Sequence, residues 1–214
     1  MLSGEIPSFV GKYQNLTFVD LSNNQFSGEI PMSLCSLSNA MDISLSQNKL
    51  TGQIPHQIDG LKSLTSLSLG ANLLSGSIPE SLGRLQKLWY LNLSRNGFSD
   101  PLPNELPNGL PSLSSIHLSY NDLHLQTKPD WICSDISRLQ LPDLHMNQLY
   151  GSISGLLQKA NKFLQLVDIS NNRITGRLPE FSDWLGLKQL VVSNNGISGQ
   201  IPTSIWKLKK SAKD

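Results

Sequence analysis

A short motif that recurs about every 24 residues constrains the fold of this chain more than any other feature. The stretch from Leu16 to Phe26 reads Leu-x-x-Val-x-Leu-x-x-Asn-x-Phe, and the stretches from Leu64 to Leu74 and from Leu88 to Phe98 repeat the pattern. Its asparagine returns at eight positions, 23 to 26 residues apart: Asn24, Asn48, Asn72, Asn96, Asn121, Asn147, Asn172 and Asn195. Self-similarity at such a period is typical of solenoids, in which each repeat adds one coil to a stack.

Each part of the motif has a mechanical role in a coil. The two leucines of Leu-x-Leu point to one face of a short strand, because side chains alternate along a strand. Stacked strands then form a parallel sheet with continuous rows of leucines behind it. The asparagine amide offers two donors and an acceptor to backbone groups where the chain leaves the strand. Five repeats continue with Gly-x-Ile-Pro or Gly-x-Leu-Pro, at Gly28, Gly52, Gly76, Gly176 and Gly199, which suits a tight turn.

The repeat unit Leu-x-x-Leu-x-Leu-x-x-Asn-x-Leu-Ser-Gly-x-Ile-Pro resembles the plant-type extracellular leucine-rich repeat. The resemblance covers the chain from about Leu2 to Ile205. It implies an α/β-type repeat solenoid, a right-handed superhelix of 24-residue repeats with a parallel β-sheet on its concave face. We expect residues 1–206 to form a half repeat plus eight repeats, and residues 207–214 to form a basic tail. Similar repeats occur in receptor-like kinases, receptor-like proteins and polygalacturonase-inhibiting proteins.

The beginning of the chain departs from this pattern. Residues 1–7 align with residues 25–31, so the chain begins inside a repeat. The terminal caps of the family, a signal peptide and an apolar membrane-spanning stretch are not visible in the sequence. These observations favour a fragment of a longer ectodomain over a naturally short intracellular repeat protein.

The repeat is least regular between Gly97 and Asn147. Gly-x-Ile-Pro is replaced there by the residues 100–103, Asp-Pro-Leu-Pro, and Pro142 falls where a strand leucine is expected. Because proline cannot donate to a ladder, we expect Leu141 to take that place through a bulge. The irregularity represents either drift in surface loops or a local change of curvature that shapes a binding site.

Charge and cysteine content exclude several classes of protein. The 17 basic and 16 acidic residues leave a net charge of +1, which gives no general field for nucleic acid. The two cysteines, Cys35 and Cys133, lie four repeats apart, which is about 20 Å at the spacing of stacked strands. A disulfide requires Cα atoms within about 7 Å, so we expect two free thiols.

The residues that alternate with the leucines face solvent and would meet a ligand. In the third repeat they are small, whereas in the fourth to sixth repeats they are rich in aromatic side chains, histidine and arginine. Tryptophan, tyrosine and arginine are typical anchors of protein interfaces, although single exposed aromatics are ordinary surface. The candidate ligand-binding residues are Phe18, Trp89, Tyr90, Asn92, Arg95, His117, Tyr120, Asp143 and His145.

Catalysis and metal binding are not expected. Ser119, a histidine and Asp143 would lie on neighbouring strands, but a flat solvated face supplies neither an oxyanion hole nor exclusion of water. Two histidines fall short of the three or four ligands of a zinc site. The sequence also has no kinase motif. We therefore predict no enzyme activity, no cofactor and no metal.

Two glycosylation sequons occur, at Asn15 and Asn92. Asn92 belongs to the candidate binding face, where a glycan would compete with a ligand. We therefore expect Asn15 to be the better acceptor.

The resemblance and the exposed side chains together predict a non-catalytic recognition module of a receptor-like protein or receptor kinase. It would bind a peptide or protein ligand, and a co-receptor, at the extracellular face of the plasma membrane or in the cell wall, in development or defence. One alternative is an inhibitor of a cell-wall-degrading glycosidase, whose acidic face would include Asp20, Asp42, Asp143 and Asp168. Another is a truncated remnant without a ligand.

Overall fold

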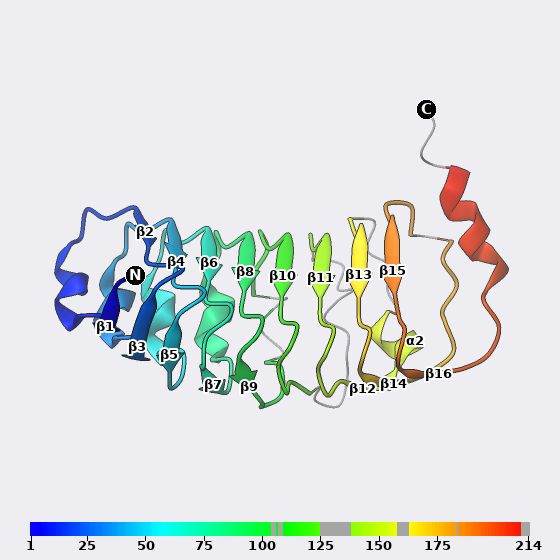
Figure 1. The fold of residues 1–214 in the computed structure, drawn as a ribbon. Helices are drawn as coiled ribbons and strands as arrows, with labels where there is room; N and C mark the ends of the chain where they lie inside the picture. The colour runs from blue at the N-terminus through cyan, green and yellow to red at the C-terminus, as the bar shows by residue number, and fades with distance from the viewer. Residues whose placement is uncertain (104–105, 107–108, 125–137, 158–162, 183, 211–214) are drawn as a thin grey trace.

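The computed structural model of the chain describes residues 1–103, 106, 109–124, 138–157, 163–182 and 184–210. Residues 207–210 are described by their backbone only. The chain winds into a solenoid whose strands form two parallel rows along its length (Figure 1). We number the coils by their motif asparagines, so that coil 1 contains Asn24 and coil 8 contains Asn195.

The main row is one eight-stranded parallel sheet with one strand from each coil. It comprises β2 (Phe18–Asp20), β4 (Asp42–Ser44), β6 (Ser66–Ser68), β8 (Tyr90–Asn92), β10 (Ser115–His117), β11 (Leu141–Asp143), β13 (Leu166–Asp168) and β15 (Gln189–Val191). Equivalent motif positions lie opposite each other, as Ile43 does Leu67 and Leu67 does Leu91. This sheet confirms the predicted leucine-rich repeat solenoid.

The second row consists of three separate parallel sheets, and all of its strands except the first follow a motif asparagine. It comprises β1 (Ser3–Glu5), β3 (Gln25–Glu29), β5 (Lys49–Thr51), β7 (Ser75–Gly76), β9 (Gly97–Phe98), β12 (Tyr150–Ser152), β14 (Arg173–Gly176) and β16 (Gly196–Ile197). The glycine of the Gly-x-Ile-Pro signature lies here, and Gly28 has a φ of +76°. A Cβ on Gly28 would come within 2.9 Å of the Glu5 side chain in the preceding coil. Glycine therefore allows both the left-handed turn and the close stacking of coils.

Short helices return the chain behind these strands in the N-terminal half (Figure 1). The 3₁₀ helices η1 (Ser8–Lys12), η2 (Met32–Ser36), η3 (His56–Gly60) and η4 (Glu80–Arg84) each follow a proline whose fixed φ suits a helix start. In the C-terminal half lie a short α-helix, α2 (Ile153–Leu156), and η5 (Thr203–Lys210). Helix η5 runs across the expected boundary between the solenoid, residues 1–206, and the basic tail, residues 207–214.

The core is a set of apolar rows that run through consecutive coils. One row contains Ile43, Leu67 and Leu91, which are at most 1% exposed. A second row, two residues further along each coil, contains Leu45 and Leu69. Burial of each such side chain contributes about 1.5–3 kcal/mol relative to exposure. Near the C-terminus the core also contains two large aromatic side chains, Phe181 and Trp184, in an edge-to-face contact with ring centroids 5.3 Å apart.

The motif asparagines bond to the backbone of two adjacent coils. The Nδ2 of Asn72 donates to the carbonyls of Leu45 and Leu69, each at 3.0 Å, and its Oδ1 accepts from the N–H of Leu50 at 3.0 Å. The residue before each motif asparagine has a left-handed backbone, with φ between +54° and +57°: Asn23, Gln47, Ala71, Arg95, Tyr120, Met146, Asn171 and Asn194. This conformation costs most residues other than glycine and asparagine about 1–2 kcal/mol, and the bonds of the following asparagine help to hold the turn.

The expected bulge at Leu141 is wrong. Pro142 itself is buried in register with Ile116, whereas Leu141 is 38% exposed. The stacked register of the neighbouring coils outweighs the proline's missing donor. The cost appears on the other side of the strand, where the pairing of β11 with β13 is reduced to Asp143 opposite Asp168.

Cys35 is a buried free thiol in η2. Burial, together with the negative charge of Asp59, raises its pKa to about 11, so the thiol is unreactive near neutral pH. Cys133 and the sequence from Lys128 to Trp131 lie outside the described residues.

Candidate recognition surface

Eight of the nine candidate residues gather on the exposed side of the main sheet. They come from β8, β10, β11 and the residues flanking these strands: Trp89, Tyr90, Asn92, Arg95, His117, Tyr120, Asp143 and His145. We call this set the recognition surface. Phe18 is also exposed, at 60%, but it lies on β2, and β4 and β6 separate it from the others.

One half of the recognition surface is a row of rings across two strands. The Trp89 and Tyr90 ring centroids are 5.7 Å apart, and the Tyr90 and His117 centroids are 5.5 Å apart. Both contacts are tilted, within the range that aromatic pairs prefer. Trp89 remains half exposed, so the row presents a rigid apolar surface to solvent.

The other half stacks residues from the turns that follow three consecutive strands. The Cζ of Arg95 lies 4.2 Å from the centroid of the Tyr120 ring, and that ring makes an edge contact with His145 at 4.8 Å. The guanidinium thus packs on a ring face, where its positive charge is favourable. Its remaining donors suit a carboxylate or a peptide backbone.

A polar cluster centred on Asp143 adjoins these rings. Its Oδ1 lies 2.5 Å from Nδ1 of His145, and its Oδ2 accepts from the Ser119 hydroxyl at 2.9 Å. The Nδ1 of His117 is 3.6 Å from the same Oδ2. Burial alone would raise the pKa of Asp143, but the hydrogen bonds from His117, His145 and Ser119 and the charge of His145 lower it to about 2. The carboxylate is therefore ionised at any physiological pH.

Asp168 joins this cluster from β13. It lies opposite Asp143 in the sheet, and its Oδ2 is 3.8 Å from Nδ1 of His145. Its Oδ1 accepts from both the backbone N–H and the hydroxyl of Ser170. The sequence places Asp168 on the exposed face, but only the cross-strand register reveals that it meets Asp143.

The geometry does not support a catalytic triad. Ser119 bonds to Asp143 rather than to a histidine. Ser115 does contact a histidine, with its Oγ 2.9 Å from Nε2 of His117. However, Ser115 is only 4% exposed and lies in register between Tyr90 and Leu141. A hydroxyl buried in this way orients the imidazole and cannot attack a substrate.

Asn92 is held against the sheet. Its Oδ1 accepts from the N–H of Ser94 at 3.0 Å and from the Ser94 hydroxyl at 2.7 Å. The amide covers Gly70 of the preceding coil so closely that a Cβ there would lie 2.9 Å from Oδ1. Asn92 therefore offers a partly buried edge to a ligand rather than a free amide.

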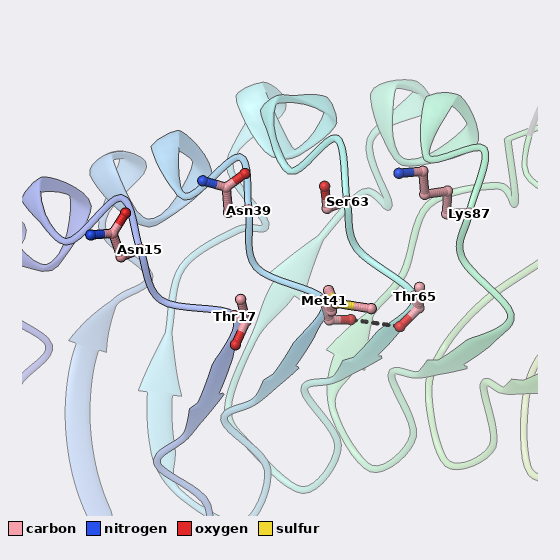
Figure 2. Close-up of a pocket in the computed structure, with 7 residues that line it drawn as sticks. All are labelled: Asn15, Thr17, Asn39, Met41, Ser63, Thr65 and Lys87. Atoms are coloured by element: carbon pink, nitrogen blue, oxygen red, sulfur yellow. Dashed lines mark hydrogen bonds between the residues drawn. The ribbon is translucent and has the colours of Figure 1, made fainter.

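A shallow groove of about 470 Å³ runs along the strand starts of coils 1 to 4 (Figure 2). Figure 2 shows Asn15, Asn39, Ser63 and Lys87 on the loops after the helices, and Thr17, Met41 and Thr65 at the start of the strands. The Thr65 hydroxyl donates to the Met41 carbonyl at 2.8 Å. The N–H of Trp89 bonds to the Thr65 carbonyl at 2.9 Å, so this row of residues continues into the recognition surface.

Comparisons with known proteins agree with this architecture. Residues 14–74 and 38–98 match a family described as "Leucine rich repeat", and residues 163–184 and 186–208 match a second family of the same description. The chain is also 35% identical over 99 residues to the Arabidopsis thaliana receptor-like kinase TMK2, a match that spans 46% of this chain and 11% of the kinase.

Two solved receptor structures are similar over nearly the whole chain. The plant peptide hormone receptor RGFR1, in complex with RGF2, has a TM-score of 0.85 and 32% identity, over 99% of this chain and 37% of that one. The Arabidopsis receptor kinase HAESA, in complex with the peptide hormone IDA and the co-receptor SERK1, has a TM-score of 0.88 and 29% identity, over 98% and 35% of the two chains.

The chain belongs to the leucine-rich repeat family, and its repeats are similar to those of plant receptor-kinase ectodomains. It spans little more than a third of the length of the two receptor structures. Among the described residues, the longest helices are too short and too polar to cross a membrane.

Proposed function

We propose that this chain is a non-catalytic module that binds an extended peptide on the exposed side of its main sheet. The observation that carries the proposal is the contiguous recognition surface on coils 4 to 6, in which Arg95, Tyr120 and His145 lie beside the row from Trp89 to His117. Rigid rings lose little conformational entropy on binding and act as anchors. The similar receptors RGFR1 and HAESA were solved with peptide hormones, which supports the same class of ligand here.

The position of the groove favours an extended ligand. Thr17, Met41 and Thr65 line the groove, and Trp89 follows Thr65 in the next coil. An extended peptide lying across successive strands would place side chains over the aromatic row from Trp89 to His117 and its backbone near the polar residues that line the groove. The function in this proposal is extracellular, in a receptor-type protein of the plant cell surface, with a co-receptor as a second partner.

The distribution of carboxylates argues against an inhibitor with one acidic face. Asp20 and Asp42 lie on β2 and β4, whereas Asp143 and Asp168 lie on β11 and β13. The intervening strands carry Ser66, Ser68 and the aromatic row. The acidic groups therefore form two separate pairs rather than one continuous surface.

The test uses a displayed library of random linear peptides selected on the immobilised chain. Enriched peptides are titrated against the wild type and the Trp89→Ala and Tyr90→Ala variants, and we expect each variant to lose on the order of 2 kcal/mol. Ser66→Ala is the matched control, because Ser66 lies opposite Tyr90 one coil earlier and does not line the groove. Equal affinities for all four proteins, or no enriched peptide, would contradict the proposal.

A further inference from the structure

Asp143 and Asp168 form an electrostatically unfavourable pair. They lie directly opposite each other on adjacent parallel strands, where like charges destabilise a sheet. Within the described parts of the chain, the ion pairs of these two carboxylates involve histidine only.

The same cluster presents three donor atoms that converge. Asp143, His145 and Asp168 each offer one ligand atom, and these atoms all lie within 4.8 Å of one another. Nδ1 of His145 is 2.5 Å from the Asp143 carboxylate and 3.8 Å from Oδ2 of Asp168. In a tetrahedral site with ligands at about 2.0–2.2 Å, the donor atoms lie about 3.4 Å apart. The contact between Asp143 and His145 must therefore open by about 1 Å, and the widest separation must close by up to about 1.4 Å, which rotations of the three side chains can supply.

We propose that Asp143, His145 and Asp168 bind a divalent transition-metal ion, of which Zn²⁺ is the representative. The ion replaces the proton between Nδ1 of His145 and Asp143, and it neutralises the opposed carboxylates. The expectation that this face holds no metal site counted only the two histidines. The cross-strand register adds two carboxylates to them.

The chemistry of the donors selects the kind of ion. A set of one imidazole and two carboxylates suits Zn²⁺ and its first-row neighbours, whereas Ca²⁺ and Mg²⁺ require mostly oxygen ligands. His117 lies next to the set: Ser115 contacts its Nε2, and its Nδ1 is 3.6 Å from Oδ2 of Asp143, so Nδ1 is the nearest donor for a fourth ligand position.

Neighbouring groups already orient the three ligands. Ser119 donates to Asp143, Ser170 donates to Asp168, and the edge contact with Tyr120 positions the His145 ring. Such supporting contacts are a regular feature of metal sites. The ligand side chains are 22–24% exposed, so an ion can enter from solvent and keep an open position beside the aromatic rings.

The experiment is a titration of the chelator-treated chain with ZnCl₂, followed by calorimetry, and with CoCl₂, followed by visible absorption. We expect saturable binding of one ion per chain, and visible Co²⁺ bands from a site that contains imidazole. His145→Gln and Asp168→Asn should each weaken Zn²⁺ binding by at least about tenfold, because even substitutions of the residues that support metal ligands typically lower metal affinity by that factor. CaCl₂ and MgCl₂ at the same concentration should give no binding.

Two substitutions control for general surface effects. Asp20 has the strand position of Asp168 and accepts a similar bond from the N–H of Ser22, but it has no histidine beside it, so Asp20→Asn should leave Zn²⁺ affinity unchanged. His56→Gln removes an exposed histidine of η3 and should also have no effect. Thermal melts of the metal-free variants establish that they are folded. The proposal is overturned if folded His145→Gln and Asp168→Asn bind Zn²⁺ like the wild type, or if the wild type shows no saturable binding.

Discussion

Arg95 and Tyr120 are stacked through the same left-handed turn in consecutive coils, with φ values of +56° and +55° and the guanidinium 4.2 Å from the ring centroid. Asparagine tolerates this conformation best among residues with a side chain, and it occupies the equivalent position at Asn23, Asn171 and Asn194. At Arg95 and Tyr120 the repeat therefore holds larger side chains in a conformation that favours asparagine, and the contact between the guanidinium and the ring offsets part of that cost.

Ala71 has the same left-handed backbone conformation, but its methyl group cannot stack as Arg95 and Tyr120 do. Ala71 has a φ of +54° and lies in the coil with the smallest exposed side chains. We expect Ala71→Asn to stabilise the chain by up to about 1 kcal/mol, because it relieves part of the cost of the left-handed conformation. Urea denaturation of the two proteins measures the difference. Ser68→Asn, in the extended strand β6, should give no gain, and an equal gain there would contradict the explanation.

Pro142 removes one donor from the sheet, and a residue of similar size should restore it. By register Pro142 lies opposite Val167, which is fully buried. We expect Pro142→Val to stabilise the chain by about 1 kcal/mol, the net value of one buried hydrogen bond less the added freedom of the unfolded chain. Hydrogen exchange should show a protected amide at residue 142. An unprotected amide, or a lower urea midpoint, would mean that the strand does not pair there.

Acid should destabilise the fold through Asp143. Its pKa falls from 3.8 to about 2 on folding, so its stabilising contribution is complete above about pH 4 and disappears as the pH falls toward 2. The shift corresponds to about 2 kcal/mol. The measurement compares urea midpoints at pH 5 and pH 2.5 for the wild type and Asp143→Asn, and a wild-type loss no larger than that of the variant would contradict the assignment.

The two sequons should differ in occupancy. Asn15 is exposed at the rim of the groove, whereas Asn92 is half-buried, bonded to Ser94 and packed over Gly70. Expression through a secretory pathway followed by peptide mass mapping should find a glycan on Asn15 and little or none on Asn92. Asn15→Gln serves as the control for site assignment. Equal occupancy would show that glycan transfer precedes the packing of Asn92 and is not limited by it.

The sequence repeat predicts the structural features that are local to one coil, but it does not predict those that depend on contacts between coils. The strands of the main sheet follow from Leu-x-Leu, because alternation is a local property. The second row of strands and the turn before each asparagine arise only when coils stack. Pro142 shows the same limit, since a local rule predicts a bulge and the register of its neighbours prevents it. Asp143 and His145 are two residues apart and foreseeable as neighbours, but their contact with Asp168 depends on pairing across 25 residues of sequence.

Because Trp184 and Trp89 differ in burial, their intrinsic fluorescence should report on two different events. Trp184 is 2% exposed and packed on Phe181, so its fluorescence should be blue-shifted and shielded from aqueous quenchers until the C-terminal coils open. Trp89 is half exposed within the recognition surface, and its emission should respond to an occupant there while the fold is intact. With Trp131 and Trp206 replaced by phenylalanine, the emission of Trp184 reports unfolding and the emission of Trp89 reports ligand binding, and the two signals differ in wavelength.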